Sequence, residues 1–235
     1  MSHRRRDPRQ ARVVTMASLR WILKERAWTP YYLKRYWRFL VFRVRHPYVV
    51  TEGFVFLGKR IEIEVSRDHA RLVLGKWVHI GNGNKIRAHN GVLRLGEKVV
   101  LGSDNVINAH LDIEIGASTL ISDWVYICDF DHAMRELDRP IKDQGLLMSP
   151  VRIGPGCWIG TKATVLRGTI IGEGSVLAAH TVARGRIPAG AIVGGVPGKI
   201  IKNRREIYDD PVEVERRRYV AAIAEEQKDA LTDGP

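Results

Sequence analysis

Aliphatic residues return at every sixth position through most of this chain. A period of six fits neither the 3.6-residue repeat of an α-helix nor the two-residue alternation of a lone strand. It predicts an all-β fold, a parallel β-helix of hexapeptide repeats in which three short strands make a coil of roughly eighteen residues. Leu74, Ile80, Ile86 and Val92 form one register, and Leu95, Leu101, Ile107 and Ile113 form a second. A two-residue slip gives Ile115, Ile121 and Ile127, and after a break come Ile153, Ile159, Val165, Ile171, Leu177, Ala183 and Ala189.

Glycine follows the aliphatic position in many of these repeats. We expect these glycines in the turns between strands, because glycine tolerates unusual φ angles. Successive coils pair their backbones with each other, so that only the two ends of the column leave unpaired edges. The glycines are Gly75, Gly81, Gly96, Gly102, Gly116, Gly154, Gly160 and Gly172.

Three segments of the chain differ in pattern. Residues 1–52 are a basic extension that we expect to be partly disordered and partly helical. Residues 53–202 are expected to form the β-helix domain, with an inserted loop at 133–150. In the last segment, 203–235, residues 211–230 have the pattern of an amphipathic helix, and we expect this helix to cover the last coil.

Positive charge is concentrated at the start of the chain. The formal net charge is +12, and residues 1–46 hold 13 Lys and Arg against only Asp7 and Glu25. Residues 1–12 are rich in arginine and are expected to be disordered until they meet an acidic partner. The basic character therefore belongs to the N-terminal segment and not to the β-helix.

Residues 31–45 predict a helix that Pro47 ends. Lys34, Arg35, Arg38 and Arg45 gather on one side of the helical wheel, whereas Leu33, Tyr36, Trp37, Leu40 and Val44 gather on the other. Such a helix can lie on an anionic membrane surface, or it can pack against the main domain with its basic side in water. Nucleic acid is not an expected partner, because the aromatic residues follow helical spacing and no known nucleic-acid module is present.

Cysteine content and hydropathy indicate the compartment. The chain has only two cysteines, Cys128 and Cys157, so a disulfide framework is not expected and a reducing compartment is. The sequence shows neither an apolar run of membrane-spanning length nor a signal-peptide core. We expect a cytoplasmic protein, which would be peripheral at the inner face of the membrane if the basic helix binds lipid.

The sixfold count stops between residues 125 and 154, in VYICDFDHAMRELDRPIKDQGLLMSPVRIG. This segment ends in SPVRIG, and CWIG and GGVPGKII follow it. With these motifs, residues 74–202 resemble the left-handed β-helix acyltransferases, above all the branch of galactoside, maltose and xenobiotic O-acetyltransferases. The resemblance implies a homotrimer with active sites between subunits, acetyl-CoA or succinyl-CoA as co-substrate, no metal, and a sugar or oligosaccharide acceptor.

The resemblance also implies the catalytic residues. The family's catalytic histidine stands where the loop leaves the coils, which is His132 here. Transfer of an acyl group from a thioester to a hydroxyl needs a base, and imidazole groups exchange protons near neutral pH. Asn108 matches the asparagine that holds the acceptor, although His110 or Asp112 could take this role. Asp131 or Asp129 could orient His132 or bind acceptor hydroxyls, and Trp158 matches a tryptophan beside the cleft.

The resemblance places the CoA-binding residues later in the chain. Thr161 and Ala179 match positions whose backbone contacts the pantetheine arm. Arg184, Lys199 and Lys202 match basic positions near the phosphates. The chain departs from the family pattern at Arg184 and Gly185, where relatives commonly have Thr-Lys. Because an arginine can still pair with a phosphate, we expect CoA binding to persist with altered contacts.

Two other functions fit a hexapeptide-repeat fold. A γ-type carbonic anhydrase needs three zinc-binding histidines, two of them five residues apart. His132 has Leu137 at that distance. A non-catalytic scaffold or binding protein would keep the coils, but it has no need for both the loop histidine and the basic residues at the CoA positions.

Overall fold

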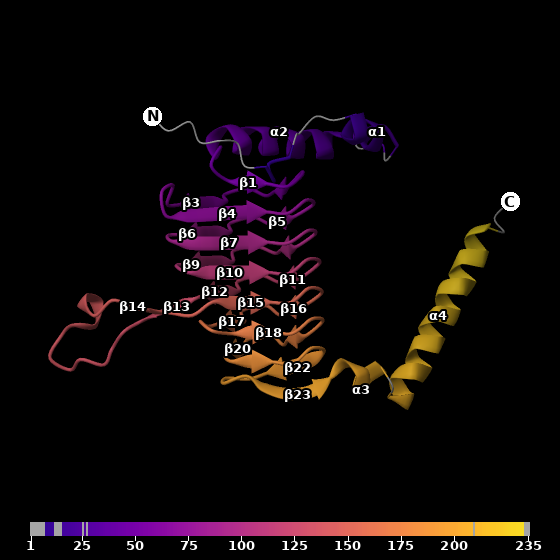
Figure 1. Cartoon of the computed structure of the whole chain (residues 1–235). Helices are drawn as coiled ribbons and strands as arrows, with labels where there is room; N and C mark the ends of the chain where they lie inside the picture. Colours follow the sequence, from indigo (N-terminus) through magenta and orange to yellow (C-terminus); the bar gives the residue numbers. More distant parts are fainter. Residues whose placement is uncertain (1–7, 12–15, 25, 27, 209, 233–235) are drawn as a thin grey trace.

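A three-sided column of stacked coils forms the centre of the molecule, and helices lie at both of its ends (Figure 1). The computed structural model describes residues 8–11, 16–24, 26, 28–208 and 210–232 of the 235-residue chain. From β1 to β12 and from β15 to β22, consecutive strands lie on different faces, and each pairs in parallel with the strand one coil away. The predicted parallel β-helix is confirmed.

The three faces of the column are three parallel sheets, which we name A, B and C. Face A contains β1 (Val50–Thr51), β4 (Ala70–Leu74), β7 (Gly91–Leu95), β10 (Asp112–Ile115), β15 (Val151–Ile153), β18 (Ile170–Ile171) and β21 (Arg186–Ile187). Face B contains β2 (Phe56–Leu57), β5 (His79–Ile80), β8 (Val100–Leu101), β11 (Leu120–Ile121), β16 (Trp158–Ile159), β19 (Val176–Leu177), β22 (Ala191–Gly194) and the antiparallel β23 (Lys199–Asn203). Face C contains β3 (Glu62–Val65), β6 (Lys85–Ala88), β9 (Val106–Ala109), β12 (Tyr126–Cys128), β17 (Thr164–Val165) and β20 (Val182–Ala183).

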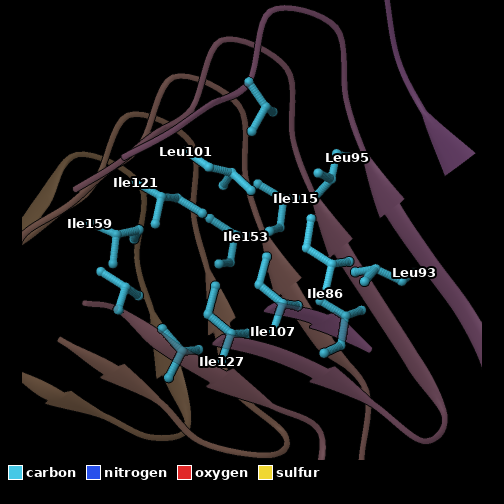
Figure 2. Packing of buried hydrophobic residues seen from close by; sticks show 14 of the residues in the cluster. Ile86, Leu93, Leu95, Leu101, Ile107, Ile115, Ile121, Ile127, Ile153 and Ile159 are labelled. Carbon is cyan, nitrogen blue, oxygen red and sulfur yellow. The ribbon is translucent and has the colours of Figure 1, made fainter. Parts of the chain in front are cut away.

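The repeated aliphatic residues fill the inside of the column. Each face contributes a ladder in which equivalent side chains of successive coils stack on one another (Figure 2). The labelled ladders are Leu95, Ile115 and Ile153 on face A, Leu101, Ile121 and Ile159 on face B, and Ile86, Ile107 and Ile127 on face C. All nine side chains are buried, so the sixfold period is the period of the core.

Two positions of the predicted register do not belong to this core. Val92 is partly exposed, and Leu93 fills the interior in its place. Because side chains alternate along a strand, β7 turns Leu93 and Leu95 inward and Val92 outward. Ala189 is exposed in the turn after β21, and Val193 closes the interior instead.

Glycine is required after the aliphatic positions for a different reason from the one predicted. None of the eight has a positive φ. Instead, the neighbouring coil approaches each of them closely: a Cβ on Gly81 would lie 2.2 Å from the carbonyl oxygen of Gly102. Positive φ falls on other turn residues, such as Lys98 and Ser118. These glycines therefore permit the close stacking of coils.

Helix α2 (Pro30–Arg45) closes the N-terminal end of the column, and α1 (Met16–Lys24) lies beside it (Figure 1). The side chains of Phe39 and Phe42 are buried against the first coil, and the ring of Phe39 lies 4.9 Å from that of Phe54. The side that was predicted to be apolar is not the packed side, because Trp37 and Leu40 remain exposed. Residues 1–7 and 12, part of the segment predicted to be disordered, lie outside the described residues.

The C-terminal segment leaves the column after β23. Helix α3 (Arg204–Tyr208) leads into α4 (Pro211–Thr232), which contacts α3 and projects away from the coils (Figure 1). The predicted cap over the last coil is therefore not formed by this helix in the single chain. Val212, Tyr219 and Val220 of α4 are exposed. Within the described part of the chain, no helix has the length and apolarity required to cross a membrane.

Candidate active site

His132 lies on a hairpin that projects from the column between face C and face A (Figure 1). Strand β13 (Phe130–His132) pairs in antiparallel fashion with β14 (Leu146–Met148), and a short 3-10 helix, η1 (Ile141–Asp143), lies near the tip. His132 is opposite Leu146 and is exposed. Paired strands are stiffer than a free loop, so the break in the repeat holds an imidazole at one edge of the column. We name this the CA edge, after the two faces that it joins.

Asp131 and His132 point to opposite sides of the hairpin, because neighbouring side chains alternate along a strand. The carboxylate of Asp131 accepts a hydrogen bond from Nε of Arg167, at 2.5 Å. Arg167 follows β17, one coil further along face C. The geometry therefore favours a role for Asp131 in fixing the hairpin over the predicted role of orienting His132. Sequence reasoning did not single out Arg167.

Aromatic rings line the CA edge on the same side of the hairpin as His132. The rings of His89, His110 and Phe130 come from three successive coils, with centroids 4.6 Å and 4.2 Å apart. His132 continues this row, at 6.5 Å from Phe130. Burial lowers the pKa of His110, and the nearby His89 and His132 lower it further against an opposing effect of Asp129. These effects favour the neutral form of His110 beside the candidate base.

Asn108 lies on face C, on the other side of the hairpin. It pairs in register with Cys128, and its side-chain oxygen is buried without a hydrogen-bond partner. Tyr126 is its other polar neighbour, and burial raises the pKa of both the Tyr126 phenol and the Cys128 thiol. Among the described residues, no hydrogen bond joins Asn108 to His132. The predicted role of Asn108 in holding an acceptor beside His132 stays a prediction.

Asp129 and Asp112 are both engaged in the framework. Asp129 is fully buried, and its two oxygens accept hydrogen bonds from the backbone N–H groups of His110, Leu111 and Asp112, at 2.7, 2.8 and 2.7 Å. The carboxylate of Asp112 lies on face A and pairs with Arg94 at 2.9 Å and with Arg152. These contacts favour structural roles for both residues over the predicted contacts with a substrate.

A groove of about 800 Å³ follows the outer side of face B, next to the edge that joins faces B and C. We name this edge the BC edge. The indole of Trp158 forms one wall and donates a hydrogen bond to the hydroxyl of Ser122, at 3.1 Å. Small residues and short aliphatic side chains form the floor. The residues that line the groove are Ser122, Gly156, Trp158, Gly160, Thr161, Val176, Ala178, Ala179, Ile192, Arg204, Ile207, Tyr208 and Arg217.

The predicted CoA-binding residues fall into separate places. Thr161 and Ala179 line the groove, and the hydroxyl of Thr161 donates to the carbonyl of Asp123 at 2.8 Å. Arg184 follows β20 and lies on the CA edge, whereas Lys199 and Lys202 are exposed on β23. These three basic residues are not among the residues that line the groove.

Two arginines that sequence reasoning missed line the groove instead. Arg204 donates to the carbonyl of Gly174 at 2.8 Å. Arg217 donates to the carbonyl of Tyr208, and its guanidinium lies 4.1 Å from the centre of the Tyr208 ring. Both residues follow the last coil, so the six-residue period does not predict where their side chains lie. The only available signal was their basic character close to the end of the repeats.

The exposed histidine and the groove occupy different edges of one chain. His132 leaves the column where β12 of face C ends, on the CA edge, and Thr161 and Ala179 lie in turns between face B and face C, on the BC edge. The width of face C separates them. Within the described residues of one chain, no group of three or more His, Cys, Asp and Glu is placed to hold a metal ion.

Known proteins resemble this chain in sequence and in fold. The family model "Bacterial transferase hexapeptide (six repeats)" matches residues 150–185. "Probable acetyltransferase Rv3034c" of Mycobacterium tuberculosis is 56% identical over 222 residues, which cover 94% of this chain and 74% of that protein. WbbJ of Escherichia coli, named for O-acetyl transfer in lipopolysaccharide biosynthesis, is 40% identical over 121 residues, which cover 46% of this chain and 62% of WbbJ.

Solved structures show the same fold at lower identity. A mutant of AntD, an N-acyltransferase from Bacillus cereus, in complex with dTDP and coenzyme A superposes with a TM-score of 0.56 at 18% identity. The match covers 76% of this chain and 95% of AntD. The column, its histidine-bearing hairpin and the extended match to a bacterial acetyltransferase together place the chain. It belongs to the left-handed β-helix family of bacterial hexapeptide-repeat acyltransferases.

Proposed function

We propose that the protein transfers a short acyl group, acetyl or a close relative such as succinyl, from acyl-CoA to a hydroxyl group of a sugar or glycan. The relative that is 56% identical is named a probable acetyltransferase, and WbbJ is named for O-acetyl transfer in lipopolysaccharide biosynthesis. The observation that carries the proposal is the exposed imidazole of His132, fixed by a paired hairpin at the edge of the column.

His132 serves as the general base in the proposed reaction. Its imidazole takes the proton of the acceptor hydroxyl while the hydroxyl oxygen attacks the thioester carbonyl. The tetrahedral intermediate then collapses, the C–S bond breaks, and the imidazolium returns the proton to the leaving thiolate. The products are an ester of the acceptor and free CoA. No covalent enzyme intermediate is needed, so the buried Cys128 and Cys157 have no part in the reaction.

The donor occupies the groove on face B in this proposal. Ala178, Ala179 and Gly160 leave room for a narrow chain such as a pantetheine arm, and Trp158 packs along one side. Arg204 and Arg217 supply positive charge for phosphates at the end of the groove nearest the C-terminal segment. Lys199 and Lys202 lie on the neighbouring β23 and add to the same positive field.

The separation of the two edges supports a homotrimer. The donor groove lies at the BC edge, whereas His132 lies at the CA edge, so that one chain holds two halves of different sites. A threefold arrangement of parallel columns brings the CA edge of one subunit to the BC edge of the next, and it completes three equal sites. Arg184, on the CA edge, then approaches the donor of the neighbouring subunit.

The cytoplasm is the proposed compartment. Both cysteines are free and buried, an arrangement that suits a reducing environment. The proposed donor is also a cytoplasmic metabolite in bacteria. The protein would therefore act on its acceptor before the acceptor leaves the cytoplasm.

A release assay tests the proposal. The purified protein is incubated with acetyl-CoA or succinyl-CoA and a panel of monosaccharides and oligosaccharides, and free thiol and product mass are measured. We expect acceptor-dependent thiol release and an ester product. His132→Ala should fold normally and lose transfer by roughly two to four orders of magnitude. His69→Ala is the matched control, because His69 is an exposed residue on the same edge three coils earlier.

Binding of the donor distinguishes an enzyme from a scaffold. Saturating CoA should raise the melting temperature of the protein, because a ligand that binds only the folded state stabilises it. Ala179→Trp should abolish this shift, since the indole would fill the groove. If CoA gives no shift, and His132→Ala and the unaltered protein release thiol at equal rates, the protein is a scaffold.

A further inference from the structure

The outer side of α2 carries an apolar stripe at the end of the column. The residues of this stripe are separated by four, three and four positions, so they form one line along the helix. They are Leu33, Trp37, Leu40 and Val44, with exposed fractions of 55%, 66%, 51% and 74%. Phe39 and Phe42, on the opposite side, are 2% and 8% exposed. The helix therefore has two apolar sides, and the fold uses only one.

Basic side chains flank this stripe. Lys34 and Arg45 are exposed, and at 100° per residue both lie on the same flank of the stripe. Two other arginines of α2 turn toward the column: Arg38 donates to the carbonyl of Leu57 at 3.2 Å, and Arg43 donates to the hydroxyl of Thr51 at 2.8 Å. The outward charge is thus placed beside the exposed apolar side chains.

Helix α1 also exposes apolar side chains next to basic ones. Leu19 and Leu23 are exposed on α1, together with Arg20 and Lys24, and Trp28 is exposed between the two helices. Helix α2 lies across the end of the column, and α1 lies beside α2 at the same end (Figure 1). We name the exposed side chains of residues 16–24 and 28–45 the end platform. It combines aliphatic and indole groups with positive charge.

We propose that the end platform binds the surface of an anionic lipid bilayer. Apolar side chains beside basic ones are typical of helices that lie at the headgroup level, where tryptophan is also favoured. Lys34, Arg45 and the basic residues of α1 face the lipid phosphates. A second copy of the chain is the less favoured occupant, because two end platforms brought together would oppose like charges.

The fold sets the orientation on the bilayer. Because α2 lies across the column end, the column stands on the membrane and its edges stay in water, including the hairpin with His132 (Figure 1). In a trimer of parallel columns, the three end platforms face the same plane. Three weak contacts then act together, and the effective affinity exceeds that of one. This last step depends on the proposed trimer, whereas the lipid contact of one platform does not.

Sedimentation with vesicles tests the inference. The full-length protein is mixed with vesicles of phosphatidylcholine alone, or with about one third phosphatidylglycerol, at low and high salt. We expect binding to the anionic vesicles that weakens at high salt. Trp37→Glu/Leu40→Glu should reduce binding at least tenfold. Lys34→Glu/Arg45→Glu should reduce it by roughly fivefold for each residue and lower its salt dependence.

Matched controls carry the same substitutions elsewhere on the surface. Trp124→Glu replaces another exposed tryptophan, and Lys142→Glu replaces an exposed lysine of the hairpin. Both should bind vesicles like the unaltered protein. Melting curves check that each variant folds, which we expect because the altered side chains are exposed. Leu33→Ser/Val44→Ser, a milder change on the same stripe, serves if a variant does not fold.

Three results would overturn the inference. The first is vesicle binding by Trp37→Glu/Leu40→Glu that equals that of the unaltered protein. The second is a pair of observations: this variant forms a smaller oligomer than the unaltered protein in size-exclusion chromatography, and neither of the two proteins binds vesicles. The stripe would then be the contact surface for a second copy of the chain. The third is binding of duplex DNA that depends on Lys34 and Arg45 without binding to vesicles.

Discussion

Arg167 holds Asp131 at 2.5 Å, and this ion pair joins the protruding hairpin to the next coil of the column. Asp131 directly precedes His132, so the contact fixes the strand that carries the candidate base. The backbone N–H of Ser149 also donates to the carbonyl of Asp129 at 2.9 Å, and together these contacts fasten both strands at the base of the hairpin. The position of the imidazole therefore depends on a coil that comes later in the sequence.

Loss of this ion pair should slow catalysis with little effect on stability. We expect Arg167→Ala to lower kcat roughly tenfold with little change in KM, because a misplaced base affects the chemical step most. The free energy of unfolding should fall by about 1 kcal/mol at most, since the pair is partly exposed. Arg167→Lys should recover part of kcat. Arg139→Ala, which removes an ion pair near the hairpin tip, is the control. Equal kcat values for the unaltered protein and the three variants would contradict the prediction.

Asp129 should prove essential for stability. Asp129→Ala leaves three backbone N–H groups without their acceptor, and we expect the free energy of unfolding to fall by about 3 kcal/mol or more. Asp129→Asn should also destabilise, because an amide NH₂ would face some of these donors. Thermal unfolding measures both, with the exposed Asp138→Ala as reference. An unchanged melting temperature with a raised KM for the acceptor would instead support the substrate-binding role predicted from the sequence.

Mixed oligomers should reveal whether the active site lies between subunits. His132→Ala lacks the base, and Ala179→Trp lacks the donor groove, so each alone should be inactive. Co-expression of the two variants should restore roughly a quarter of the activity of the unaltered protein, because random assembly gives that share of interfaces with one intact half from each subunit. If co-expression restores no activity although mixed trimers form, the two halves belong to one chain.

Acidification should destabilise the fold. Burial lowers the pKa of His46, His79 and His110 from the ordinary value of 6.5, with Arg45 and Arg67 adding to the effect at His46 and Arg35 at His79. Below pH 6.5 these histidines bind protons in the unfolded chain more readily than in the folded chain. Their contribution to the free energy of unfolding is therefore complete above this pH and is lost as the pH falls. Melting temperatures between about pH 8 and pH 5 measure the slope.

The contribution of His110 to the dependence of melting temperature on pH can be measured separately. His110→Gln removes a group that faces His89, His132 and Asp129, and it should flatten the dependence of melting temperature on pH. The exposed His69→Gln is the matched control. A steeper slope in the His110 variant, or the same slope in both, would contradict the assignment.

The sequence by itself determined the column and the place of its interruption. The sixfold return of Ile, Leu and Val specifies three faces per coil, because the short strand on each face turns at least one of these side chains to the interior. The break at Asp129 to His132 interrupts this count, so the protruding segment was visible without coordinates. The family motifs between Ile153 and Lys202 then indicated the chemistry.

Only the tertiary structure decided which polar residues work together. The Asp131–Arg167 pair, the cradle around Asp129 and the groove lined by Arg204 and Arg217 join residues from different coils or from segments beyond the repeats. Likewise, α2 buries Phe39 and leaves Trp37 in water, although a helical wheel favours the opposite choice. A repeat pattern shows which side of a strand is apolar. It does not show which polar side chains of different coils come into contact, or which side of a capping helix packs on the column, because both depend on the rest of the fold.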